Sequence, residues 1–311
     1  MCSVRTPLHS LSPSQRFKVG NPSTVTPPSS IRLSAVESDK SMSALTPVND
    51  QQQLLQLKKL TIKNRQGETL VGLLHETGSK ELVILCHGFR SSKESITMLN
   101  LANRVEHEGI SAFRFDFSGN GESEGSFAYG GYWKEAEDLR SVIEYFEQQN
   151  LSVVCIVGHS KGGGVVLLYA SKYHDVKAVV NVSGRYDLTK GIMERLGPHF
   201  MHGIEKEGFV DVKNEAGSVR FRVTKDSLMD RLNTNMHDAC LAIDKDCSVL
   251  TVHGSKDEVI PISDAFDFAR IIPNHKLHVI DGADHCYNLH QSELSSAVIA
   301  FIKTVLRQEE T

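Results

Sequence analysis

Residues 158–162 (Gly-His-Ser-Lys-Gly) have the clearest capacity for chemistry in this sequence. An apolar run over 151–157 precedes them, and a helix-forming segment over 161–173 follows. A Gly-x-Ser-x-Gly pattern between a strand and a helix is typical of a nucleophile elbow, a strained turn that admits only small residues two positions either side of the serine. The pattern therefore predicts that Ser160 is a nucleophile presented at the end of a strand.

Ser160 needs a base to remove its proton and an acid to orient that base. Asp257 comes shortly after the expected strand 248–252, and His285 comes shortly after the next expected strand, 276–280. Parallel sheets place their functional groups at these carboxyl ends of strands. The three residue types, their order and their positions favour Ser160, Asp257 and His285 as a catalytic triad.

Each partner also has an alternative interpretation. Taken alone, Asp257 is better explained as a turn or helix-cap residue, and Glu258 is a rival acid shifted by one position. His285 alone is one of fourteen histidines. Asp281 and Asp284, which flank it, are interpreted as loop-forming residues. The joint pattern, and not any single residue, is what supports the triad.

Two backbone N–H groups are expected to form an oxyanion hole, which stabilises the charge of a tetrahedral intermediate. One belongs to Lys161, directly after the nucleophile, and the other to Phe89, in the loop after the expected strand 81–86. We interpret the side chains of His87 and His159 as structural. The side chain of Lys161 is either a solvated cation or one that biases the charge of the substrate.

A second glycine-rich loop, 116–125, follows the expected strand 110–115. Asp116 is expected to hold this loop by accepting hydrogen bonds from backbone N–H groups. The loop contains neither Gly-x-Gly-x-x-Gly nor Gly-Lys-Ser/Thr. Its sequence therefore does not favour a phosphate site.

Strands and helices alternate along the expected domain, 50–311, after an opening hairpin over 57–75. Such alternation predicts an α/β fold with a mostly parallel central sheet and helices on both faces. The expected strands are 81–86, 110–115, 151–157, 176–182, 248–252 and 276–280, and the expected helices are 94–108, 133–149, 161–173, 262–271 and 291–307.

Residues 185–235 interrupt this alternation where one crossover helix would suffice. Long insertions of this kind are often functional, and we interpret the segment as a lid over Ser160. It contains an expected hairpin with strands 208–213 and 218–223. Met193, Phe200 and Phe209 are candidates for lining a substrate pocket, with packing of the lid onto the domain as the alternative for each.

Five segments together resemble the α/β-hydrolase superfamily of serine hydrolases, most closely its cinnamoyl/feruloyl-esterase-like and monoglyceride-lipase-like branch. The similarity covers about residues 55–307. The segments are 87–89 (His-Gly-Phe), 116–123, 158–163, 253–257 and 282–287.

The resemblance implies an α/β-hydrolase fold with an inserted lid. It gives Ser160 as nucleophile, His285 as base and Asp257 as acid, with Phe89 and Lys161 as oxyanion donors. Lys161 is a departure, because many relatives have Gln or Met there. Since the donor is a backbone N–H group, the change bears on substrate preference and leaves catalysis intact.

The composition excludes several classes of protein. The net charge of −4 comes without a basic stripe, which argues against nucleic acid as a partner. No apolar run reaches the ~20 residues of a transmembrane helix. The cysteines lack the spacing of a metal site and are interpreted as free thiols in a reducing compartment. No metal and no organic cofactor is implied.

The first 48 residues differ in character from the rest. Up to Val36 there is no acidic residue, while serine, proline and a few basic residues are frequent. This composition is typical of an organelle transit peptide, here a plastid one, and predicts a chloroplast protein of a plant. The alternatives are an ordinary disordered tail and a shorter cytoplasmic form that starts at Met42.

These features lead to the prediction of a serine esterase that cleaves small or medium carboxylic esters, such as a hydroxycinnamate ester or a monoacylglycerol. Four alternatives use the same fold: an acyltransferase or thioesterase with the same triad, a small-molecule receptor that turns over slowly, a lyase, and a peptidase. Fold alone does not choose among substrates.

Overall fold

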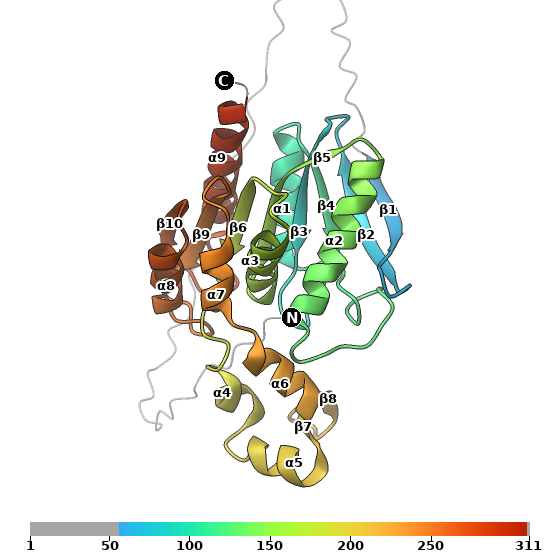
Figure 1. The fold of residues 1–311 in the computed structure, drawn as a ribbon, viewed down its shortest axis with the longest axis vertical. Coiled ribbons are helices and arrows are strands. Elements are labelled where there is room, and N and C mark those ends of the chain that lie inside the picture. Colours follow the sequence, from blue (N-terminus) through green and yellow to red (C-terminus); the bar gives the residue numbers. More distant parts are fainter. Residues whose placement is uncertain (1–55, 310–311) are drawn as a thin grey trace, which may run out of the picture. The chain divides into compact units, whose positions relative to one another are not determined.

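An eight-stranded sheet forms the centre of the computed structural model, which describes residues 56–309 (Figure 1). Its strands are β1 (Gln56–Lys63), β2 (Thr69–Glu76), β3 (Glu81–Cys86), β4 (Ser111–Phe115), β5 (Ser152–His159), β6 (Ala178–Val182), β9 (Ser248–Gly254) and β10 (His275–Ile280). In space they follow the order β1-β2-β4-β3-β5-β6-β9-β10. The β1–β2 and β2–β4 pairings are antiparallel, and all the others are parallel. This confirms the predicted mostly parallel sheet.

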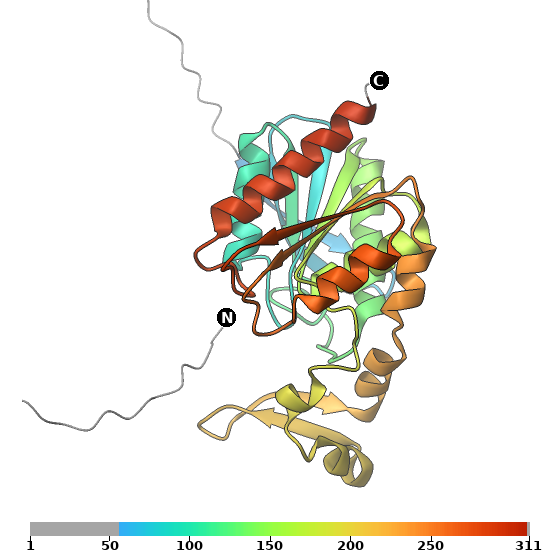
Figure 2. The same ribbon diagram turned by 90° about the vertical axis from the view of Figure 1, so that its left-hand side faces the viewer.

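Helices cover both faces of this sheet, as predicted (Figures 1 and 2). On one face, α1 (Ile96–His107) and α9 (Gln291–Glu309) pack against each other. The other face carries α2 (Tyr132–Gln148), α3 (Lys161–Tyr173), α7 (Met236–Ala242) and α8 (Ser263–Ile271). The sheet is therefore the middle layer of three, and each face has its own hydrophobic core.

The central strand β3 shows how one sequence supplies both cores. Because side chains alternate across a strand, Val83 and Leu85 enter the core under α1 and α9, whereas Ile84 and Cys86 enter the other core. All four are fully buried. Burial contributes about 1.5–3 kcal/mol for each large aliphatic side chain. The loop that follows β3 and carries Phe89 therefore starts from a fixed point.

The segment between β6 and α7 forms a separate group of elements beyond one end of the sheet (Figure 1). It contains α4 (Ile192–Leu196), α5 (Phe200–Glu207), the antiparallel hairpin β7 (Phe209–Lys213) and β8 (Val219–Thr224), and α6 (Lys225–Asn233). The predicted hairpin is thus confirmed. The segment has a small core of its own, made by Ile192, Ile204, Val223 and Leu228 together with Tyr129. Its action as a lid stays a prediction.

Three further expectations concern the whole chain. The expected transit segment, 1–48, lies outside the described residues. Cysteines 86, 155, 240 and 247 are buried free thiols, as expected for these four. Within residues 56–309, no helix is both long enough and apolar enough to cross a membrane.

Candidate functional site

Ser160 lies in a strained turn between β5 and α3. Its backbone angles, φ 57° and ψ −115°, are ones that side-chain-bearing residues rarely adopt. A β-carbon on Gly158 would overlap the carbonyl group of Gly162, and one on Gly162 would overlap the carbonyl group of Cys86. The N–H of Ser160 also donates to the carbonyl of Val182, at 2.8 Å. The two glycines of the motif are therefore required by the turn itself.

The structure brings Ser160, His285 and Asp257 into one hydrogen-bonded chain. The distance from Ser160 Oγ to His285 Nε2 is 3.0 Å, and that from His285 Nδ1 to Asp257 Oδ2 is 2.7 Å. Because a carboxylate accepts and does not donate, Nδ1 carries a proton and Nε2 is free to accept the one on the serine hydroxyl. The geometry is that of a nucleophile, a base and an orienting acid.

Asp257 is held as a carboxylate by its surroundings. Its Oδ1 accepts hydrogen bonds from the N–H groups of Val259, at 2.9 Å, and Ile260, at 2.8 Å. Burial favours the neutral acid, but the hydrogen bond and the charge of His285 outweigh burial and lower the pKa of Asp257. Glu258, the rival acid, is exposed.

A second histidine near Asp257 was missed by the sequence analysis. His253 is fully buried, and its Nε2 lies 3.4 Å from Asp257 Oδ2. The same Nε2 donates to the carbonyl of Ile260, at 2.9 Å. Burial lowers the pKa of His253, so it supports the acid loop as a neutral donor. The only feature of the sequence that could have indicated this role is the position of His253 near the end of β9, just before the loop that carries Asp257.

His159 and Tyr287 hold the loop that carries His285. His159 Nε2 donates to the carbonyl of His285, at 2.9 Å, and burial lowers the pKa of His159 to about 4. The hydroxyl of Tyr287 lies 2.8 Å from Ser183 Oγ and donates to the carbonyl of Val252, at 3.1 Å. The structural role predicted for His159 agrees with these contacts.

The loop after β3 lies directly against the nucleophile. A β-carbon on Gly88 would be 3.1 Å from Ser160 Cβ and 3.2 Å from the carbonyl oxygen of His159, so a side chain here would crowd the elbow. His87 Nδ1 donates to the carbonyl of Gly88, at 2.8 Å, and its Nε2 accepts from the N–H of Phe117, at 3.1 Å. Burial lowers the pKa of His87 to about 4. His87 is therefore a neutral structural residue that positions the loop of Phe89.

The side chain of Lys161 is not solvated, which corrects one of the two expectations for it. It is buried, and its Nζ lies 2.6 Å from Glu135 Oε1 on α2 and 5.1 Å from the ring centroid of Tyr132. Burial raises the pKa of Glu135 to about 7 despite this ion pair. Lys161 thus anchors the first turn of α3 to α2, while its backbone N–H stays at the elbow.

Asp116 organises the loop 116–125, as predicted. It accepts hydrogen bonds from the N–H groups of Lys93, at 2.7 Å, and Glu122, at 2.9 Å. The ammonium group of Lys93 is also 2.6 Å from Asp116 Oδ2, in a fully buried ion pair that the sequence did not suggest. The loop is therefore held by its own carboxylate.

The three candidate pocket residues all lie in the inserted segment. Met193 is 57% exposed. Phe200 packs against the segment's own core, and the ring of Phe209 is covered by the guanidinium of Arg222, at 3.6 Å. A role for these residues in substrate binding stays a prediction.

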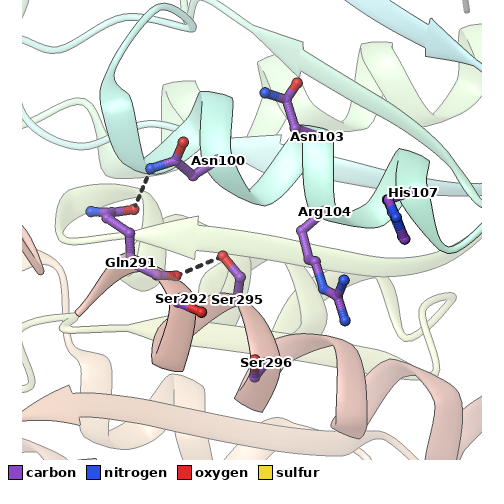
Figure 3. A pocket seen from close by; sticks show the side chains of 8 residues that line it. All are labelled: Asn100, Asn103, Arg104, His107, Gln291, Ser292, Ser295 and Ser296. Atoms are coloured by element: carbon purple, nitrogen blue, oxygen red, sulfur yellow. Dashed lines mark hydrogen bonds between the residues drawn. The ribbon is translucent and has the colours of Figure 1, made fainter. Parts of the chain in front are cut away.

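Ser160 lines neither of two cavities found in the described part of the chain. One, of about 460 Å³, lies between α1 and α9 (Figure 3). Its amide groups bond to each other, as in the 3.2 Å contact between Asn100 and Gln291, and its Arg104 pairs with Glu108. The other, of about 370 Å³, lies beside the loop of Phe89.

Comparison with known proteins gives a family match over part of the chain. The family described as serine aminopeptidase, S33, matches residues 77–206, which include Ser160 but neither Asp257 nor His285. An uncharacterized protein of Saccharomyces cerevisiae is 28% identical over 231 residues, 67% of this chain and 69% of the yeast protein. Protein phosphatase methylesterase 1 of Candida albicans is 32% identical over 92 residues, 29% of this chain and 25% of its own length.

Solved structures match a larger share of the chain. Est1E from Butyrivibrio proteoclasticus with ferulic acid bound superposes with a TM-score of 0.70 at 24% identity, covering 80% of this chain and 99% of Est1E. The α/β-hydrolase GrgF from a Penicillium species gives a TM-score of 0.69 at 20% identity, covering 81% of this chain and 99% of GrgF. At these identities the likeness shows the fold.

Proposed function

We propose that this chain, which has the α/β-hydrolase fold, is a serine esterase that hydrolyses carboxylic esters through an acyl-enzyme on Ser160. The observation that carries the proposal is the hydrogen-bonded chain from Ser160 through His285 to Asp257, set on a strained elbow. A serine in such a chain is an activated nucleophile.

The reaction follows from these positions. Ser160 Oγ attacks the ester carbonyl carbon as its proton passes to His285 Nε2, and Asp257 balances the resulting imidazolium charge. The N–H groups of Phe89 and Lys161 stabilise the oxyanion. His285 then protonates the leaving alcohol as the carbon–oxygen bond breaks. Water, deprotonated by His285, then attacks the acyl carbon of the acyl-enzyme. His285 returns that proton to Ser160 Oγ as the bond between Oγ and the acyl carbon breaks, and the acid is released.

Two ester classes are proposed as substrates: a hydroxycinnamate ester and a monoacylglycerol. The ferulic acid bound to Est1E supports the first class. Beside the elbow, the ring of Phe89 packs edge-on against those of Phe127, Tyr129 and Phe221, at centroid distances of 5.3, 5.7 and 5.6 Å. An aromatic or acyl chain would meet a hydrophobic surface there.

Covalent labelling tests the proposal directly. The full chain is incubated with a fluorophosphonate, which reacts with activated serines, and the adduct is located by peptide mass mapping. We expect a single adduct on Ser160, and none on a folded Ser160→Ala variant. A folded wild-type protein that stays unlabelled would contradict the proposal. Turnover of an ester is then compared with that of its amide, because the matching family description names an aminopeptidase.

A further inference from the structure

The cavity of about 370 Å³ lies between the loop after β3, the loop 116–125 and strand β8. Its lining combines three arginines with two aromatic rings and a glycine-rich stretch of backbone. The lining residues are Arg90, Ser91, Gly119, Asn120, Gly121, Phe127, Arg220, Phe221 and Arg222. A cavity of this size accepts a small polar group.

The positive charge of this cavity is not balanced. Arg222 is neutralised by Asp211, with Nε at 2.7 Å and a terminal nitrogen at 2.9 Å from the carboxylate. Among residues 56–309, neither Arg90 nor Arg220 has a carboxylate partner. Burial and the nearby charge of Arg220 lower the pKa of Arg90. Two guanidinium groups therefore share the cavity without a counter-charge.

Two acidic residues close to the cavity form ion pairs with lysines. Asp116, beside Gly121, binds the buried Lys93. Glu122 binds Lys93 and also Lys59, at 2.6 and 2.5 Å. Because these carboxylates are engaged with lysines, they do not compensate Arg90 and Arg220.

Arg90 is held in place by its backbone and by aromatic rings. Its φ of 49° is in the left-handed region, which is uncommon for arginine. The turn is closed by a hydrogen bond from the N–H of Ser91 to the carbonyl of Gly88, at 3.2 Å. The guanidinium lies 4.8 Å from the ring centroid of Phe221 and 5.8 Å from that of Phe127. Stacking of this kind orients the guanidinium and leaves its N–H donors free for an anion.

The cavity is lined in part by the loop that also carries the proposed oxyanion donor. Arg90 follows Phe89, whose N–H is the proposed oxyanion donor, and a β-carbon on Gly88 would lie 3.1 Å from Ser160 Cβ. The ring of Phe89 packs on Phe127 and Phe221, which line the cavity. For its anion to reach the arginines, an acidic ester that reacts at Ser160 must therefore extend along this loop.

We propose that this cavity binds an anionic group, a carboxylate or a phosphate, carried by the ester substrate at a distance from the scissile bond. The proposal rests on the esterase function and adds to it a substrate class, acidic esters. Guanidinium groups recognise both anions through paired N–H donors.

The test compares esters that differ in one charge. The substrates are mono-para-nitrophenyl esters of linear dicarboxylic acids of increasing length, each beside its methyl-capped neutral counterpart. For the full-length protein we expect kcat/KM to favour the acidic member at an optimal length. Arg90→Gln and Arg220→Gln should each lower that acidic-to-neutral ratio about tenfold, as for the loss of one charged hydrogen bond. Lys213→Gln, which removes an equal charge from the same hairpin outside the cavity, should preserve the ratio.

The possible outcomes distinguish the proposed anion site from the proposed esterase function. Ser160-dependent hydrolysis without a preference for acidic esters, or a ratio insensitive to both arginines, overturns the anion site and leaves the esterase intact. Turnover that survives Ser160→Ala, or none at all, overturns both. Inorganic phosphate that inhibits acidic esters competitively supports the proposal. Phosphate that alters turnover of neutral esters through Arg90 and Arg220 would mark an effector site and overturn it.

Discussion

The reaction centre and the inserted segment are built in opposite ways. At the centre, the side chains of Asp257 and His253 are fully buried and tied to neighbouring backbone groups. In the inserted segment, Met193 and Met201 are 57% and 46% exposed, and the Asp211–Arg222 pair lies at the surface. The sheet therefore fixes the geometry around Ser160, whereas the insertion presents exposed side chains, for which we propose a role in substrate selectivity.

Asp257→Asn gives the largest expected effect and tests the first half of this comparison. The amide would stabilise the wrong tautomer of His285, so kcat for ester hydrolysis should fall about 10³- to 10⁴-fold with the fold unchanged. Phe200→Leu in the insertion, a change of hydrophobic volume, should alter kcat/KM by no more than about tenfold. Steady-state kinetics and circular dichroism measure both. Equal losses in the two variants would break the comparison.

A pair of glycine substitutions carries the comparison to stability. In Gly158→Ala the new methyl group meets the backbone of Gly162, which cannot move aside, and we expect a loss of about 3 kcal/mol. Gly203→Ala in α5 meets its nearest atom, the carbonyl oxygen of Phe209, at 3.3 Å and gains helix propensity. Its effect should stay below about 1 kcal/mol. Denaturant unfolding measures both changes in stability. A Gly158→Ala variant as stable as the wild type would contradict the close packing of the elbow.

The last prediction concerns pH and compares two ion pairs, Glu135–Lys161 in the domain and Asp211–Arg222 in the insertion. The pKa of Glu135 is about 7 in the folded chain, above its ordinary 4.5, so the folded state holds its proton longer. Stability from this group is present below pH 4.5 and is lost as pH rises through 7, by about 3 kcal/mol. Glu135→Gln should remove that part of the pH dependence. As the control, Asp211→Asn at the exposed pair should leave the midpoint of denaturant unfolding unchanged. If the stability of Glu135→Gln depended on pH in the same way as that of the wild type, this explanation would be wrong.

The sequence predicts those parts of the structure that are determined by local sequence patterns. The strand 81–86 was predicted to the residue, because a continuous apolar run fits a strand buried on both faces. Ser160, Asp257 and His285 were selected because each follows such a run. Their hydrogen bonds could not be predicted from spacing alone, since they join residues 125 positions apart (Ser160 and His285) and 28 positions apart (His285 and Asp257).

Other contacts had no sequence signal. Lys161 looks like a surface lysine, and its burial depends on Glu135, which α2 brings to it from 26 positions away. The unbalanced charge of Arg90 and Arg220 depends in the same way on how the hairpin packs beside the loop of Phe89. Side-chain pairing across elements is a tertiary property, so composition and periodicity do not report it.

The three residues of the proposed triad should not lose their positions together when the protein begins to unfold. Ser160 follows β5, which has a partner strand on each side, whereas His285 follows β10, the last strand of the sheet. Edge strands open at lower cost than central ones. On warming, the base should therefore leave the nucleophile before the sheet as a whole melts. Catalytic activity would then be lost while most of the secondary structure was still folded, because the β10 edge of the sheet opens first.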